Sequence, residues 1–209
     1  MGKSDEIRRL AQARGIEYLL HFTPAQNACS ILENGLAGRS ILDAHGVDYV
    51  YTDAWRLDGI EDGVSLSITD VNHAMLRAKR RDYPGPWLIV GIDPSVLWTH
   101  ECRFCWHNAA SREMTRHTGY IGGPYAFRRM FESRPAPGPE KICQREKYGL
   151  EPQDPTDNAA EVQVRGVIDP ELIIAIGVQY EAHRPEMEKL IADLGRNIPV
   201  EWVDKIFRG

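Results

Sequence analysis

The apolar positions of the chain follow two periods, one helical and one extended. A spacing of three to four residues predicts helices at 5–14, 71–81, 125–131 and 184–194. Short apolar or alternating runs predict strands at 18–22, 47–52, 64–69, 87–92, 161–167, 172–178 and 200–203. Thr23, Pro24 and Gln26 have the pattern of a capped helix start, which predicts one more helix to about Glu33.

These elements are interspersed and show no regular strand–helix–strand alternation. Such an order favours an α+β fold with a mixed or largely antiparallel sheet, in which the apolar run 87–92 is a central strand. The length of 209 residues suits one core, so we expect a single domain over residues 1–209. The proline-rich stretch 134–157 predicts a long irregular loop, and such loops in compact domains are usually functional or disordered.

The composition, 43% hydrophobic and 26% charged, is typical of a soluble globular protein. No apolar run approaches the ~20 residues that span a bilayer, and the charged start shows no signal peptide, so we expect a cytoplasmic location. The net charge of −5 argues against a nucleic-acid partner, which usually needs a basic face. Two basic clusters, 77–81 and 128–134, weaken that argument, although each is more often a solvated helix face.

The four cysteines do not form the pattern of a disulfide framework. Cys29 lies in a predicted helix and is expected to be a small core residue. Cys102, Cys105, His107 and Cys143 have the chemistry of four zinc ligands, but their spacing is unlike that of a zinc module. Buried or free thiols are therefore the favoured interpretation, with a structural zinc site as the alternative.

Three residues stand where chemistry is possible, and each also has an ordinary structural interpretation. Glu161 opens a strand directly after the long loop, so its carboxylate can face a cleft or simply be solvated. Arg56 lies in a polar connection and has the planar donors to grip a diphosphate, as any loop arginine does. His21 precedes a predicted helix N-terminus, which suits a phosphate, but histidines in apolar strands are more often core residues. The motifs of dinucleotide folds, phosphate-binding loops, zinc proteases and serine hydrolases are absent.

Taken in order, several segments resemble the DarT family, the toxin half of a toxin–antitoxin pair with the ADP-ribosyltransferase fold. The similarity begins at Leu20-His21-Phe22-Thr23 and continues through Arg56-Leu57-Asp58-Gly59 and the strand 64–68. Its clearest segment, residues 155–162 with the sequence P-T-D-N-A-A-E-V, resembles the signature around the family's catalytic glutamate. The resemblance implies an enzyme that cleaves NAD, releases nicotinamide and attaches ADP-ribose to thymine or guanine in single-stranded DNA. The stretch 102–110 is similar to the guanine-modifying branch.

The resemblance also assigns roles to single residues. Glu161 would be the catalytic carboxylate that stabilises positive charge on the ribose. Arg56 would be the catalytic arginine at the NAD diphosphate, chosen over Arg39 for its R-x-D-G context. The remaining candidates for NAD contact are His21, Phe22, Thr23, Asn27 and Ser30. Residues 119–161 would form the loop that meets the DNA, and its candidate contacts are Tyr120, Tyr125, Arg128 and Tyr148. The family uses no metal, and its toxicity implies a macrodomain antitoxin that removes ADP-ribose.

Two other classes of function stay open at this point. The first is an ADP-ribosyltransferase of the same fold that acts on protein or RNA. The second is a module that binds NAD or nucleic acid without catalysis, which would show no turnover with or without Glu161.

Overall fold

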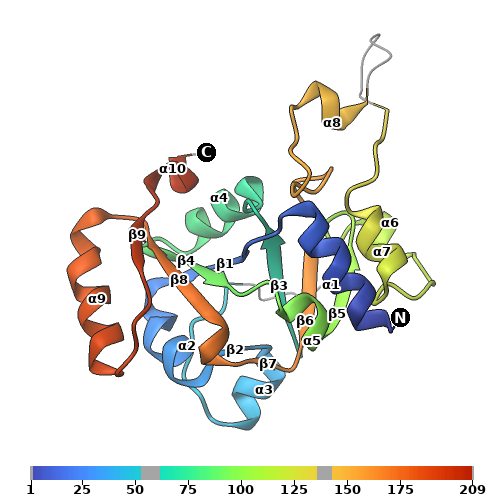
Figure 1. Ribbon diagram of the computed structural model, residues 1–209. Helices are drawn as coiled ribbons and strands as arrows, with labels where there is room; N and C mark the ends of the chain where they lie inside the picture. Colours follow the sequence, from blue (N-terminus) through green and yellow to red (C-terminus); the bar gives the residue numbers. More distant parts are fainter. Residues whose placement is uncertain (1, 53–61, 136–142, 209) are drawn as a thin grey trace.

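A seven-stranded sheet forms the centre of the computed structural model, which describes residues 2–52, 62–135 and 143–208 (Figure 1). From one edge to the other its strands are β5 (Glu101–Cys105), β6 (Glu161–Arg165), β3 (Gly63–Ile68), β1 (Leu19–Pro24), β4 (Trp87–Ile92), β8 (Ile173–Val178) and β9 (Val200–Trp202). All neighbours are antiparallel except β8 and β9, which run parallel. The predicted mixed sheet and the α+β class are thereby confirmed.

The position of β4 follows from its composition. Every residue of the run 87–92 is buried, and the strand lies between β1 and β8 with helices covering both faces. A strand that is apolar on both faces can only be stable when both are covered, so the prediction of a central strand was correct.

Helices pack on both faces of the sheet (Figure 1). The N-terminal helix α1 (Lys3–Arg14) contacts α5 (Val96–Thr99) and α7 (Pro124–Arg129), and α4 (His73–Asp82) contacts α10 (Asp204–Arg208). The others are α2 (Ala28–Asn34), α3 (Arg39–Ala44), α6 (Arg112–Thr115), α8 (Gln144–Lys147) and α9 (Arg184–Asp193), with short 3₁₀ turns at Ala25–Asn27, Pro170–Leu172 and Glu181–His183. A two-stranded sheet joins β2 (Leu36–Ala37) to β7 (Val167–Ile168). None of the described helices is long and apolar enough to cross a bilayer.

The core is divided by the sheet. The larger cluster lies among β1, β3, β5, β6 and the helices around α1 and α7, where Phe104, Trp106 and Phe127 are fully buried. A smaller cluster under α4 and α10 includes Leu76, Trp87 and other apolar side chains. The two clusters hold the strands rigidly enough to position polar groups at their ends.

The strand and helix after residue 18 differ from prediction. Strand β1 continues to Pro24, which pairs with Trp87, and the Ala25 N–H donates to Pro86 O (2.9 Å). The hydroxyl of Thr23 accepts a hydrogen bond from Asn27 instead of capping a helix, so α2 begins only at Ala28. Ladder hydrogen bonds to β4 thus prevailed over the local capping pattern.

Three other expectations were wrong or incomplete. Residues 47–52 form no strand, because the backbone N–H and C=O of Val50 bond the side chain of Asn27 in place of another strand. Cys29 is exposed on α2 and is not a core residue. Strand β5 was not predicted, because its two cysteines were considered as metal ligands and not for their alternation.

Candidate active site

A cavity of about 320 Å³ opens where the two halves of the sheet separate. Strands β1 and β3 pair at Leu19–Ile68 and Leu20–Ser67, and beyond these positions the two strands diverge. The cavity wall consists of residues from β1, β3, β2, β6, α2, α3, α4 and the connecting loops. These residues are 20–23, 27, 30, 31, 35–39, 42, 49–52, 63–67, 72, 75, 79, 108–110 and 159–161. Its volume lies in the range of small-molecule sites.

Glu161 is half-buried in this wall, as the first residue of β6. Its backbone is fixed by pairing with Cys105 of β5, and its carboxylate Oε1 accepts a hydrogen bond from the Ala109 N–H at 2.6 Å. A charge-assisted bond of this length orients the carboxylate strongly. The predicted carboxylate is therefore held rigidly in the cavity wall, which a solvated surface glutamate would not be.

Strand β1 supplies the opposite wall. His21 Nδ1 lies 3.0 Å from Ser65 O on β3, and because a carbonyl only accepts, Nδ1 is the protonated nitrogen in this contact. This bond bridges the two strands just past the end of their ladder. Phe22 is half-buried and packs against Trp87, with ring centroids 6.2 Å apart, while Thr23 is buried. These three of the residues predicted to contact NAD all line the cavity.

Asn27 and Ser30 also line the cavity, but Asn27 is engaged in the wall itself. Its Nδ2 donates to Thr23 Oγ1 (2.9 Å) and to Val50 O (2.8 Å), and its Oδ1 accepts from Val50 N (2.7 Å). The amide thus fastens the segment 49–51 to the strand β1. Ser30 is half-buried on α2.

Positive charge reaches the cavity from Arg39, the alternative to Arg56 in the sequence, and from Lys79 of the basic cluster 77–81. The Arg39 guanidinium lies over the ring of Tyr51 at 4.6 Å, and Lys79 Nζ donates to Thr52 O at 2.7 Å. Burial, followed by the hydrogen bond to Asp43, raises the pKa of Tyr49 above its usual value. Arg56, the predicted catalytic arginine, lies outside the described residues.

The four residues predicted to contact DNA do not line the cavity. Tyr120, Tyr125, Arg128 and Tyr148 are all exposed. Lys3 Nζ donates to the Tyr120 hydroxyl at 3.1 Å, and Arg128 forms an ion pair with Glu6, so two of the four contact α1. Tyr148 follows α8, on the segment that stands out from the body of the molecule (Figure 1).

The three cysteines considered as zinc ligands occupy two different places in the fold. Cys102 and Cys105 are buried on β5, and the Cys102 thiol donates to Val96 O at 3.4 Å, whereas Cys143 is half-buried at the start of α8. Burial raises the pKa of Cys102 to about 12. Within residues 2–52, 62–135 and 143–208, no three His, Cys, Asp or Glu side chains are grouped as metal ligands would be.

The loop 107–110 is the part of the site that sequence reasoning missed. Its contribution is a backbone N–H, that of Ala109, which carries no side-chain signal. The only hint in the sequence was the stretch 102–110, which contains this loop and is part of the family resemblance.

A family model described as "ssDNA thymidine ADP-ribosyltransferase, DarT" matches residues 20–208. No curated protein sequence matches this chain.

Three solved structures share the fold. DarTG of Thermosipho africanus in complex with ADP-ribose has a TM-score of 0.57 and 18% identity over 91% of this chain. This chain spans 51% of that longer one. DarT of Thermus sp. 2.9 in complex with carba-NAD⁺ has a TM-score of 0.61 and 14% identity, covering 91% of this chain and 97% of that one. The same protein in complex with ADP-ribosylated ssDNA has a TM-score of 0.59 and 16% identity, covering 92% and 96%.

The family match covers most of the chain, and the solved structures share its fold. The chain therefore belongs to the DarT family of single-stranded DNA ADP-ribosyltransferases.

Proposed function

We propose that this protein transfers ADP-ribose from NAD to a base of single-stranded DNA, with Glu161 as its catalytic carboxylate. The observation that carries the proposal is the place of Glu161, which the Ala109 N–H holds in the wall of the same cavity that His21, Phe22 and Thr23 line. A carboxylate fixed in a partly closed site stabilises a developing cation far better than one in water.

NAD would lie along β1 in this cavity. His21 and Thr23 would contact its sugars, Phe22 would contact an aromatic ring, and Ser30 would add a hydroxyl from α2. The diphosphate requires cations, and we assign this role to Arg56 together with Arg39 and Lys79 of the cavity wall. The bonds of Asn27 make it a support of the wall at residues 49–51, beside any contact with NAD.

The reaction would proceed as a substitution at the anomeric carbon of the nicotinamide ribose. The bond from this carbon to the nicotinamide nitrogen breaks, and its electron pair leaves with neutral nicotinamide. Glu161 would stabilise the positive charge that develops on the ribose. A nitrogen of the base then forms the new bond to the same carbon and loses its proton, either to Glu161 or to water.

The DNA would approach through residues 119–161, as part of one domain that spans residues 1–209. Tyr120, Tyr125 and Tyr148 would stack on bases and Arg128 would contact phosphate, all from exposed positions. Since the matched family model names thymidine, thymine is the first base to test and guanine the second.

The proposed partner is a macrodomain antitoxin of the DarG type, because the reaction would damage the host's own DNA. The DarTG structure from Thermosipho africanus contains ADP-ribose, which is the group that such a hydrolase would remove. We place both proteins in the cytoplasm, where NAD and DNA are available. Co-expression with the macrodomain should restore growth. If no macrodomain restores growth, the proposed partner is wrong.

The test of the proposed function is a mass measurement on DNA. Purified protein is incubated with NAD and a panel of single-stranded oligonucleotides that each lack one base, and the products are weighed. We expect a gain of one ADP-ribose on every oligonucleotide except those that lack the target base. RNA of the same sequences and bulk protein serve as rival acceptors. Modification of either in place of DNA would overturn the proposed substrate, and no NAD turnover with any acceptor would favour the non-catalytic binding module.

A further inference from the structure

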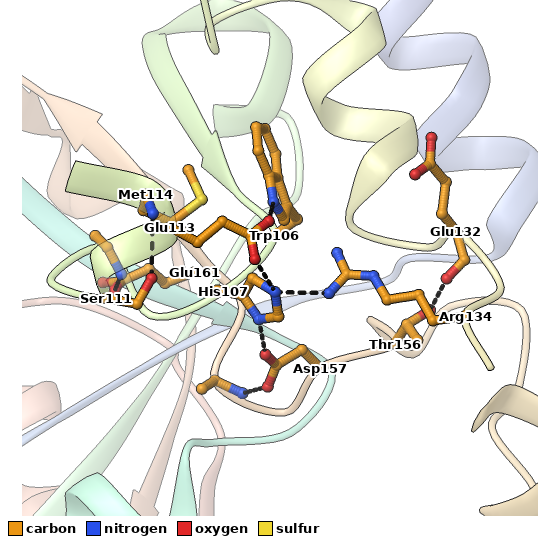
Figure 2. Close-up of polar contacts among 12 residues, drawn as sticks. Trp106, His107, Ser111, Glu113, Met114, Glu132, Arg134, Thr156, Asp157 and Glu161 are labelled. Atoms are coloured by element: carbon orange, nitrogen blue, oxygen red, sulfur yellow. Dashed lines mark hydrogen bonds and ion pairs between the residues drawn. The ribbon is translucent and has the colours of Figure 1, made fainter. Parts of the chain in front are cut away.

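The two chain segments that meet at Glu161 remain joined beyond the end of their strand pairing. The β5–β6 ladder ends at Cys105 and Glu161, after which the chain on one side runs into loop 106–110 and on the other comes from residues 157–160. Two bonds bridge these segments. The Ala109 N–H donates to Glu161, and His107 Nδ1 contacts Asp157 Oδ2, as Figure 2 shows for the second. His107 lies two residues before Ala109, and Asp157 lies four residues before Glu161.

Asp157 also shapes the chain that leads into β6. Its Oδ1 accepts the Ala159 N–H at 2.8 Å, and its backbone carbonyl accepts the Ala160 N–H at 2.9 Å. One carboxylate therefore binds the turn before Glu161 through one oxygen and the opposite loop through the other. Asp157 and His107 each have a side chain only 25% exposed, so this contact is largely shielded from water.

The donor role of His107 Nδ1 follows from its partner, because a carboxylate such as that of Asp157 can only accept a hydrogen bond. Arg134 Nη1 lies 2.7 Å from His107 Nε2, and a guanidinium N–H can donate but cannot accept. Nε2 also faces the Glu113 carboxylate, which can only accept, and with either state of Nε2 the proton on Nδ1 is donated to Asp157. Arg134 and Glu113 thus hold the far side of the ring, while Nδ1 makes the bond between the two loops.

A second layer surrounds this contact. Glu113 Oε2 lies 3.0 Å from His107 Nε2, while its Oε1 accepts the indole N–H of Trp106 at 2.6 Å. The Arg129 guanidinium covers the Trp106 ring at 3.8 Å. The Trp106 hydrogen bond, followed by the nearby charges of His107, Arg134 and Arg129, lowers the pKa of Glu113. The cluster joins loop 106–113 to residues 129–134, which lie in the proposed DNA-contacting segment.

We propose that His107 is a positioning residue for the reaction, which rests on the proposed function: through Asp157 and Arg134 it holds the Ala109 N–H against Glu161. His107 does not line the cavity and is blocked on both nitrogens, so it does not itself act on the substrate. Its removal leaves Glu161 in place on β6 but lets the loop that orients the carboxylate relax. Small displacements of catalytic groups cost up to about 100-fold in rate, so we expect a loss of roughly 10- to 100-fold in kcat.

Two amide substitutions separate this role from simple packing. In His107→Asn, the side-chain nitrogen occupies the position of Nδ1 and keeps the donor to Asp157. In His107→Gln, the amide reaches only the position of Nε2, so it keeps the contact with Arg134 and loses the bridge. His107→Ala loses both, and His117→Ala is the matched control, because His117 contacts the Trp106 ring at 4.9 Å but is exposed and touches neither loop partner.

The experiment measures kcat and KM for NAD in the transfer to DNA, together with nicotinamide release in the absence of DNA and the affinity for NAD. We expect kcat to fall 10- to 100-fold in His107→Ala and His107→Gln, and to recover to within a few-fold of wild type in His107→Asn. NAD affinity should change less than twofold throughout. In wild-type protein with ¹⁵N-labelled histidine, the His107 imidazole should show a protonated Nδ1, the nitrogen that donates to Asp157.

Three results would overturn the proposal. The first is a wild-type kcat in His107→Ala, and the second is an equal loss in the Asn, Gln and Ala variants. The third is a ¹⁵N spectrum in which Nε2 carries the only proton. If wild-type protein modifies no DNA, the proposed substrate fails instead. Nicotinamide release, which uses the same carboxylate, then shows whether the order of the His107 variants holds.

Discussion

Replacing Asn27 by alanine is the sharpest test of how the cavity wall is built. Asn27 is buried, and its amide makes three hydrogen bonds, one to Thr23 and two to the backbone of Val50. These bonds are the reason why residues 47–52 lie against β1 without forming a strand. Alanine would remove all three and leave the Val50 N–H and C=O to find new partners.

The magnitude follows from the number and burial of these bonds. A hydrogen bond contributes a net ~0.5–1.5 kcal/mol, and an orphaned buried group costs more than the mean. We expect Asn27→Ala to lower the free energy of unfolding by roughly 2–4 kcal/mol. For a domain of this size, 1 kcal/mol shifts Tm by ~2–4 °C, so the melting temperature should fall by roughly 5–15 °C.

Urea denaturation and calorimetric NAD binding measure the two consequences together. NAD binding should weaken as well, because the ligand must now order the wall at 49–51, which the amide held before. Asn34→Ala is the matched control: its Nδ2 makes one exposed bond, to Ser30 O at 3.2 Å, so stability should change by no more than ~0.5 kcal/mol. Equal effects of the two substitutions would refute the assignment of Asn27 as the support of the wall.

Three further predictions concern single positions. Because burial raises the pKa of Cys102 to about 12, its thiol should resist iodoacetamide at about pH 8.5 in native protein, while exposed Cys29 reacts. Peptide mass mapping measures both modifications, and equal rates would contradict the prediction. The same raised pKa of Cys102 makes the free energy of unfolding depend on pH, because the folded state favours the neutral thiol. This contribution to stability is complete below the ordinary pKa of 9.0 and is lost as the pH rises towards 12. Denaturation at stepped pH measures it. Gly35→Ala should destabilise the protein by well over ~1 kcal/mol, because φ is +84° and a Cβ would lie 2.2 Å from the carbonyl oxygen of Ile168. Gly15→Ala is the control, which should cost only ~1 kcal/mol, because φ is +71° but the space around it is open. Similar melting temperatures of the two variants would refute the predicted difference.

The sequence predicted those parts of the fold whose cause is local. The uninterrupted apolar run at 87–92 could only be a covered strand, and the alternation at 64–69 matches β3. The helix at 71–81 likewise corresponds to α4, where Asn72 caps the first turn. In each case the side chains of the segment itself carry the information.

The errors arose where a distant partner decides the structure. The run 47–52 has the composition of a strand, but the amide of Asn27 takes the backbone groups of Val50. The capping pattern at Thr23 does not start a helix, because the pairing of β1 with β4 continues through this residue. Tertiary contacts of this kind override local propensity and cannot be seen in one sequence.

The same distinction between local and distant causes applies to the candidate active site. Glu161 could be chosen from its position after a loop and from the family signature, and it lies in the cavity wall together with His21, Phe22 and Thr23. The Ala109 N–H that orients it, and the charges of Arg39 and Lys79 beside it, depend on chain segments that meet only in the folded protein. Their roles, like that of Arg56, remain predictions.

The most direct test of the account is the replacement of Glu161 by glutamine. The amide keeps an Oε1 that accepts the Ala109 N–H, so the geometry of the site is preserved and only the negative charge is lost. ADP-ribose transfer to single-stranded DNA is measured by mass spectrometry, NAD affinity by calorimetry, and Glu188→Gln on the exposed face of α9 is the control. We predict that transfer falls by at least about 100-fold while NAD affinity changes little. Transfer at a rate close to that of wild type would contradict the assignment of Glu161 as the catalytic carboxylate.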